Sequence, residues 1–180
     1  MKTNSFIKLF IIISSAILNY TISSAQSQQP VIGDAKWGFK FDCPEGWRYE
    51  MAFNGAMLTH DSIKGTILVM PHKAKSYDAV KKLMEIGISQ KGNELKPCDT
   101  IIELNDHTIG GDYSGLWNNK NVKARCYGAF NANGGGGAFI FGISKPDEYS
   151  DKLKETTEKI ARELFFFPAH ESKPKALPIH

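Results

Sequence analysis

The sequence predicts a single α+β domain, with about seven or eight antiparallel strands and two helices. Three observations support this prediction. Residues 122–143 have the pattern of two strands joined by a glycine-rich turn, and residues 76–91 and 144–164 carry apolar side chains at helical spacing. The chain has 180 residues, which is enough for one domain with a substantial buried core. The two predicted helices are far apart in the sequence, so each could cover part of the sheet.

Residues 1–25 have the pattern of a secretory signal peptide. Lys2 and Lys8 are the only charged residues before Asp34, residues 6–18 are largely apolar, and a run of small residues ends at Ala25. We therefore expect an exported protein, periplasmic or secreted, with no transmembrane span after cleavage. An uncleaved N-terminal anchor is the alternative.

The remaining chain divides into three parts of different composition. Residues 26–35 are polar and predict a flexible lead-in, residues 36–168 form the α+β domain, and residues 169–180 are a loose tail. Removal of the two leader lysines leaves 20 basic and 19 acidic side chains. This near balance gives no general attraction to nucleic acid or to acidic lipid.

Alternation of apolar and polar residues predicts the strands, and turn residues separate them. Asn54-Gly55 is a strong hairpin signal. The predicted strands are residues 37–41, 47–53, 56–60, 66–70, 100–104, 107–117, 122–130 and 138–143, followed by a short final strand or clamp at 165–167.

The hairpin at residues 122–143 is the centre of the predicted sheet. Within 122–130 the alternation predicts one buried set of side chains and one exposed set, and the exposed set includes Arg125 and Tyr127. Residues 138–143 are apolar on both faces and belong in the middle of a sheet. Gly134 to Gly137 could cradle a phosphate, but they lead into a strand and lack a following Lys-Ser/Thr, so a hairpin turn is favoured.

Both predicted helices have apolar stripes and recognisable ends. Ser76 can cap the first helix, and Lys91-Gly92-Asn93 should stop it. Residues 144–147 should open the second helix, because Pro146 suits an early helical position and acidic residues follow it.

The order of these elements resembles the PsbP-like fold. An opening Phe39-x-Phe41-x-x-Pro44-x-Gly46-Trp47 leads into strands, a first helix, further strands and a closing amphipathic helix that ends in Phe. The resemblance extends over residues 37–167 and includes the photosystem extrinsic PsbP proteins and bacterial envelope proteins of the DcrB type. It implies an α/β/α sandwich in an exported binding or assembly module without known catalysis. The lipid-anchor cysteine of DcrB-type proteins is absent here, and the resemblance assigns no functional residue.

Aromatic residues are the candidate binding residues. Trp117 lies beside the polar tip at 118–121, which suits contact with a partner or ligand. Tyr113, Tyr127 and Trp47 complete the candidate set. The alternative is that each aromatic side chain packs on a face of the sheet.

A thiol-based or hydrolytic enzyme is the alternative function, using Cys43 or Cys126 with His60 or His72. Cys126 falls on the predicted core face, whereas Cys43 falls in a turn and is expected to be the more exposed thiol. The acidic neighbours of Cys43 should raise its pKa. With Cys98 the chain has three cysteines, which allows one disulfide and a free thiol, or three buried thiols.

No histidine has the spacing of a metal site, so the sequence predicts no metal and no cofactor. The leading hypothesis is a non-catalytic module that contacts a protein partner in the cell envelope, or a small apolar ligand, through its sheet. A third hypothesis is a structural envelope protein whose sheet edge pairs with a larger assembly.

Overall fold

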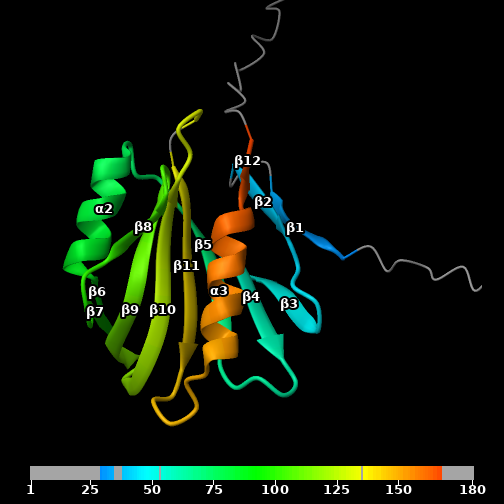
Figure 1. The fold of residues 1–180 in the computed structure, drawn as a ribbon, viewed down its shortest axis with the longest axis vertical. Helices are drawn as coiled ribbons and strands as arrows, with labels where there is room; N and C mark the ends of the chain where they lie inside the picture. Colours follow the sequence, from blue (N-terminus) through cyan, green and yellow to red (C-terminus); the bar gives the residue numbers. More distant parts are fainter. Residues whose placement is uncertain (1–28, 35–37, 53, 135, 168–180) are drawn as a thin grey trace, which may run out of the picture.

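The computed structural model describes residues 29–34, 38–52, 54–134 and 136–167. These residues form a nine-stranded antiparallel sheet, a three-stranded antiparallel sheet and two helices (Figure 1). The predicted α+β class is therefore confirmed, although the described residues contain twelve strands where the sequence predicts about seven or eight. The predicted signal peptide and the tail at 169–180 lie outside the described residues.

The large sheet contains most of the predicted strands. In spatial order its strands are β3 (Trp47–Ala52), β4 (Gly55–His60), β5 (Thr66–His72), β11 (Gly137–Ser144), β10 (Lys120–Phe130), β9 (Thr108–Trp117), β7 (Asn93–Pro97) and β6 (Ile88–Gln90), with β8 (Ile102–Asn105) also paired to β9. The small sheet has the order β1 (Val31–Asp34), β2 (Phe39–Asp42) and β12 (Phe165–Phe166). β1 lies inside the segment expected to be a lead-in, and β12 confirms the predicted short final strand.

Helix α2 (Tyr77–Ile86) begins where predicted and ends earlier. The Ser76 hydroxyl accepts a hydrogen bond from the Ala79 N–H at 3.2 Å. The helix stops at Gly87, whose φ is +83° and where a Cβ would overlap the Leu95 carbonyl oxygen. The prediction that it continues to residue 91 is wrong, because the chain turns there into β6 and β7.

Helix α3 (Asp151–Glu163) begins later than predicted. The Ser150 hydroxyl accepts a hydrogen bond from the Leu153 N–H at 3.3 Å and caps the helix. Residues 145–148 form a turn instead, in which the Glu148 N–H donates to the Lys145 carbonyl at 3.1 Å. Pro146 therefore belongs to a turn before the helix and does not occupy its first position.

The predicted central hairpin is confirmed as β10 paired antiparallel with β11. In its connection the Gly136 N–H donates to the Ala74 carbonyl at 2.9 Å, and the Gly136 carbonyl accepts from the Asn131 N–H at 2.9 Å. These contacts make the glycine segment a turn that is anchored to the chain before α2.

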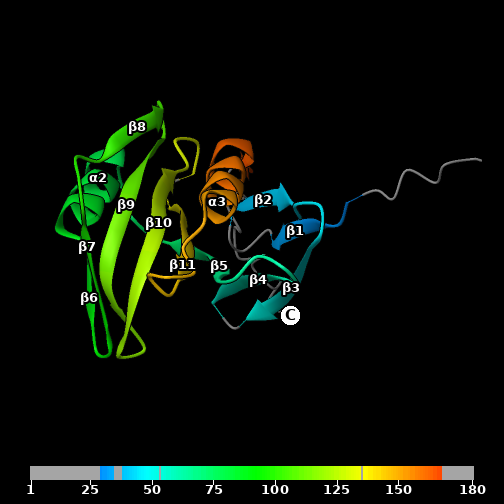
Figure 2. The same cartoon turned by 60° about the horizontal axis from the view of Figure 1, so that its bottom comes forward.

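The two helices lie on opposite faces of the large sheet (Figure 2). Helix α2 packs over β7, β9 and β10, while α3 and the small sheet cover the other face. Both faces of β10 are therefore covered from Ala124 onward, while Lys120, Asn121 and Lys123 stay exposed. The prediction that Arg125 and Tyr127 belong to an exposed set is wrong, because α3 covers them and leaves the Tyr127 side chain 0% exposed.

Candidate functional site

A cavity of about 330 Å³ lies between α2 and the face of the large sheet beneath it. The sheet forms its floor and α2, with the segment that follows it, forms its roof. The floor residues are Met70, Tyr113, Trp117, Cys126, Phe139 and Phe141, and the roof residues are Leu83, Met84, Ile86, Gly87, Ile88, Ser89 and Gln90.

Pairing of the strands explains why these floor residues share one face. Cys126 lies opposite both Gly111 on β9 and Phe141 on β11, and directly opposed residues in a ladder point to the same face. Because side chains alternate along a strand, Tyr113 and Phe139 lie on this face as well. Four strands thus direct aromatic and sulfur-containing side chains toward α2.

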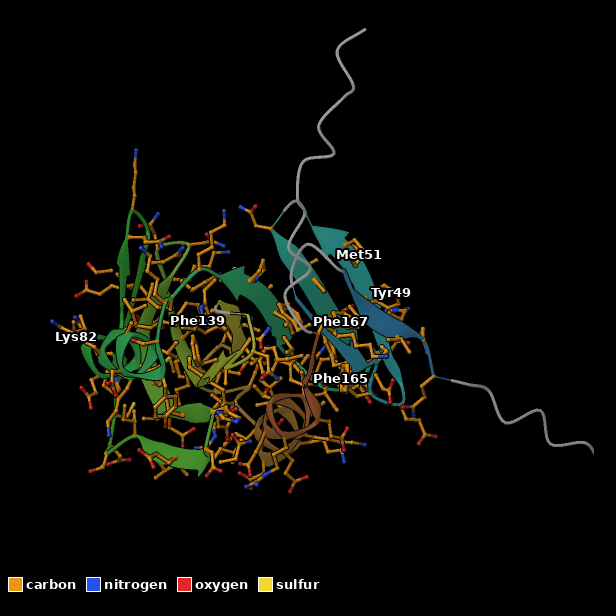
Figure 3. All side chains as sticks on the ribbon, turned by 90° about the horizontal axis from the view of Figure 1, so that it is seen from above. Tyr49, Met51, Lys82, Phe139, Phe165 and Phe167 are labelled. Carbon is orange, nitrogen blue, oxygen red and sulfur yellow. The ribbon has the colours of Figure 1, made fainter. Side chains whose placement is uncertain are left out.

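The aromatic side chains form a continuous row along the floor. The ring centroids of Trp117 and Phe141 lie 6.0 Å apart, and those of Phe141 and Phe139 also lie 6.0 Å apart. His72 continues the row, 4.5 Å from Phe139. Figure 3 shows Phe139 on the sheet beside α2, with Lys82 on the outer side of that helix.

Tyr113 holds the end of α2 over the cavity. Its hydroxyl donates a 2.7 Å hydrogen bond to the Met84 carbonyl. Burial raises the pKa of Tyr113, and nearby Cys126 and Glu85 raise it further, so the phenol stays neutral and remains a donor. Its position fixes the distance between the helix and the sheet.

His72 is held as a neutral imidazole at the end of the row. Its Nδ1 accepts from the Ala74 N–H at 3.2 Å, which leaves Nε2 to carry the proton and donate to the Ala129 carbonyl at 3.0 Å. Burial lowers the pKa of His72. None of the residues that line the cavity carries a formal charge at neutral pH.

The rim of the cavity reaches solvent. The side chains of Leu83 and Ile86 are 48% and 52% exposed, although both lie on the flank of α2 that faces the cavity. Ser89 and Gln90 are exposed as well. A ligand could therefore enter along this flank without displacing the core.

Comparison with known proteins gives a match in structure and none in sequence. No family model and no curated protein matches the chain. The solution structure of cyanobacterial PsbP (CyanoP) from Synechocystis sp. PCC 6803 matches 84% of this chain and 99% of that chain, with a TM-score of 0.51 and 13% sequence identity. The fold is PsbP-like. This confirms the resemblance found in the sequence, and at 13% identity it extends to the fold alone.

Within this PsbP-like domain, two of the four predicted binding residues line the cavity. Trp117 is half-buried, and Tyr113 is 2% exposed, so Tyr113 can contact a ligand only from inside the cavity. The other two lie elsewhere. Trp47 is buried in the opposite core against His60, with ring centroids 5.5 Å apart, and Tyr127 is buried beneath α3.

Sequence reasoning missed most of the floor and roof. Phe139 and Phe141 were recognised as apolar residues of a central strand, but their alternation with Ile140 would also have placed them together on one face. Leu83 and Ile86 also indicate the cavity. They make the apolar stripe of α2 wider than the part of the helix that is buried, which consists of Val80 and Met84.

Neither predicted nucleophilic thiol is set up for reaction. Cys43 is 1% exposed, its Sγ contacts the Trp47 carbonyl at 3.4 Å, and burial raises its pKa. The expectation that Cys43 is the more exposed thiol is wrong; Cys98 is the exposed one, and all three cysteines are unpaired. Burial, followed by the charge of Asp112, raises the pKa of Cys126 well above its ordinary value.

Two further features of the described residues bear on function. They contain no group of three or more His, Cys, Asp or Glu side chains that could hold a metal ion. Among the same residues, neither helix has the length and apolarity needed to span a bilayer.

A polar network on the other face of the PsbP-like sheet attaches α3 to β9 and β10. The Tyr127 hydroxyl donates to Glu158 Oε2 at 2.8 Å and accepts from Arg125 Nε at 2.8 Å. Arg125 also contacts Glu158 at 3.2 Å and Asp112 at 3.6 Å. On α3 itself, Arg162 binds the second Glu158 oxygen at 2.7 Å. Because its groups satisfy one another, the network stabilises the packing of α3.

This network should make stability depend on pH. Hydrogen bonds from Arg162, and then from Tyr127 and Arg125, hold the pKa of Glu158 below its ordinary value despite partial burial. A lowered folded-state pKa adds stability above the unfolded value of about 4.3, and that stability is lost as pH falls through the folded pKa. The free energy of unfolding can be measured by urea unfolding at a series of pH values between neutral and acid. Glu158→Gln should reduce the fall of this free energy at acid pH. Parallel curves for the two proteins would contradict this expectation.

Proposed function

We propose that this chain is an exported, non-catalytic binding module that takes a small, neutral, apolar ligand in the cavity beneath α2. The observation that carries the proposal is the cavity itself, which combines an aromatic and thioether lining with an exposed apolar rim. Pockets that bind small molecules have volumes of roughly 300–1,000 Å³ and mostly apolar walls. Export rests on the leader pattern of residues 1–25.

The chemistry of the walls selects the class of ligand. A charged group would lose its hydration inside the cavity without gaining an opposite charge, and burial of an unpaired charge is strongly unfavourable. Trp117, Phe139 and Phe141 offer ring faces and edges, and Met70 and Met84 offer adaptable thioethers that pack well against rings. A flat or cyclic apolar compound fits these walls best.

A neutral fluorescent naphthylamine, N-phenyl-1-naphthylamine, tests the proposal. Its emission should rise on addition of the protein, and Trp117→Ala should raise the dissociation constant at least about tenfold, because a buried aromatic contact contributes on that scale. Leu116→Ala is the matched control: Leu116 is the neighbouring residue on β9, points to the other face and is 36% exposed. Its substitution should leave binding unchanged.

Two outcomes would count against the cavity as the site. One is a probe that gives no saturable signal with the unmodified protein. The other is equal weakening by Trp117→Ala and Leu116→Ala, which would indicate a general change in the domain. Circular dichroism of both variants shows whether the fold is retained.

A further inference from the structure

β3 leaves one edge of the large sheet open, at the opposite end from β6. Within the described residues it pairs with β4 alone. Four consecutive residues, Arg48 to Met51, are exposed, so side chains on both faces of this part of the strand reach solvent. Figure 3 shows Tyr49 and Met51 at this edge, on the far side of the molecule from α2.

The β3 edge has few of the features that usually prevent pairing with another chain. Natural edge strands are commonly very short, bulged, or interrupted by Pro or by charged residues, above all Lys. β3 contains the charged residues Arg48 and Glu50 but no Lys and no Pro. β3 has six residues with the sequence WRYEMA, and its register with β4 runs without a shift. The opposite edge strand, β6, has three residues. Because an antiparallel ladder alternates, every second residue of β3 directs its N–H and C=O away from β4, where they are free to pair.

We propose that β3 pairs antiparallel with β3 of a second copy of this chain, about a two-fold axis that passes between the two Tyr49 residues. In this register Arg48 lies opposite Glu50 of the second copy, and the symmetry repeats the pair. Met51 lies opposite Trp47 of the second copy. Opposite charges and aromatic residues placed directly across an antiparallel pair both stabilise it.

The charges of β3 select this register over its neighbours. A symmetric shift in one direction places Arg48 opposite Arg48, and a shift in the other places Glu50 opposite Glu50, so both put like charges across the strand pair. Arg48 already contacts Asp61 of its own chain, and both side chains are exposed. A guanidinium has five N–H donors, so Arg48 can hold a second carboxylate. Glu50 has no ion pair with any described residue.

The dimer is independent of the ligand proposal. The cavity lies beneath α2 and is lined by β5, β11, β10, β9 and β6, whereas β3 lies at the other end of the sheet from β6. One six-residue strand from each copy makes an interface smaller than that of a stable complex, so we expect a reversible dimer that forms in the micromolar range. A two-fold interface of this kind closes on itself and ends the assembly at two copies.

Sedimentation velocity across the micromolar range, on protein expressed from the full chain, tests the dimer. Glu50→Lys places a cation opposite Arg48 twice and should raise the dissociation constant at least about tenfold. The charge-swapped pair Arg48→Glu with Glu50→Lys restores complementarity and should return the constant to within about threefold of the original. Lys82→Glu, on the outer side of α2, is the control for a change of net charge and should have no effect.

A monomer at every concentration would overturn the proposal, and so would a dimer that Glu50→Lys leaves intact. Failure of the charge-swapped protein to re-form the dimer, while its circular dichroism stays native, would overturn the proposed register. Tyr49→Lys gives a second disruption, because it places two lysines across the symmetry axis. Tyr49 is 38% exposed, so this variant is expected to fold.

Discussion

Gly142→Ala should lower the free energy of unfolding by about 2 kcal/mol, because the added methyl group has no space beneath α3. A Cβ at this position would overlap the Thr157 hydroxyl and lie 3.1 Å from the Thr157 Cβ. Thr157 is 0% exposed, and its hydroxyl donates to the Leu153 carbonyl at 2.7 Å, so it cannot yield without losing that bond. Urea unfolding monitored by circular dichroism measures the loss.

A matched glycine in the same sheet provides the control. A Cβ at Gly111 would meet its nearest neighbour, Ile101, at the ordinary contact distance of 3.5 Å. Gly111→Ala should therefore be close to neutral, or slightly stabilising because alanine restricts the unfolded chain. The double variant Gly142→Ala with Thr157→Ala removes the overlapping hydroxyl and should recover part of the loss. Equal destabilisation by the two glycine variants would show that the contact with α3 is not the cause.

Arg125→Met should also lower the free energy of unfolding by about 2 kcal/mol, since it removes the cation that Asp112 and Glu158 share. The Arg125 side chain is 15% exposed, while those of Asp112 and Glu158 are 35% and 30% exposed. Solvent therefore screens the pair in part, and Arg162 still binds Glu158, which keeps the loss below that of a fully buried pair. Methionine retains most of the apolar stem and isolates the effect of the charge.

Two comparisons test the electrostatic origin of this loss. Lys123→Met removes an exposed cation from the same strand and face, and should change stability by less than about 0.5 kcal/mol. The deficit of Arg125→Met should shrink as pH falls into the acid range, because Arg125 helps to hold the pKa of Glu158 below its ordinary value and protonation of Glu158 removes that contribution. A deficit that does not vary with pH would point to packing instead.

Helices and strands that carry a clear local pattern in the sequence were predicted correctly. The β10–β11 hairpin, the start of α2 at Ser76 and the short strand after α3 follow from alternation, capping and the aromatic run. The misplaced helix ends have tertiary causes. Helix α2 ends at Gly87, where the backbone passes close to Leu95. Leu95 lies beyond the helix, so the spacing of apolar residues within α2 carries no information about this contact.

The candidate site was only partly predictable for the same reason. The sequence indicates Trp117 because it lies beside a polar tip, and Tyr113 as a further aromatic candidate, and the cavity includes both. Tyr127 and Trp47 were selected as aromatic residues without a certain place in the core. Whether such a ring is buried depends on which helix or sheet covers its face, and alternation along a strand cannot supply that information.

The pairing of β12 with β2 has a consequence for synthesis of the chain. Phe165 and Phe166 lie beside Lys40 and Phe39, which come from the other end of the described chain. A ribosome therefore releases almost the whole domain before the small sheet can close over Phe39 and Phe41. Until then these apolar residues lack their final neighbours, so the nascent chain is expected to remain open to chaperones for most of its translation.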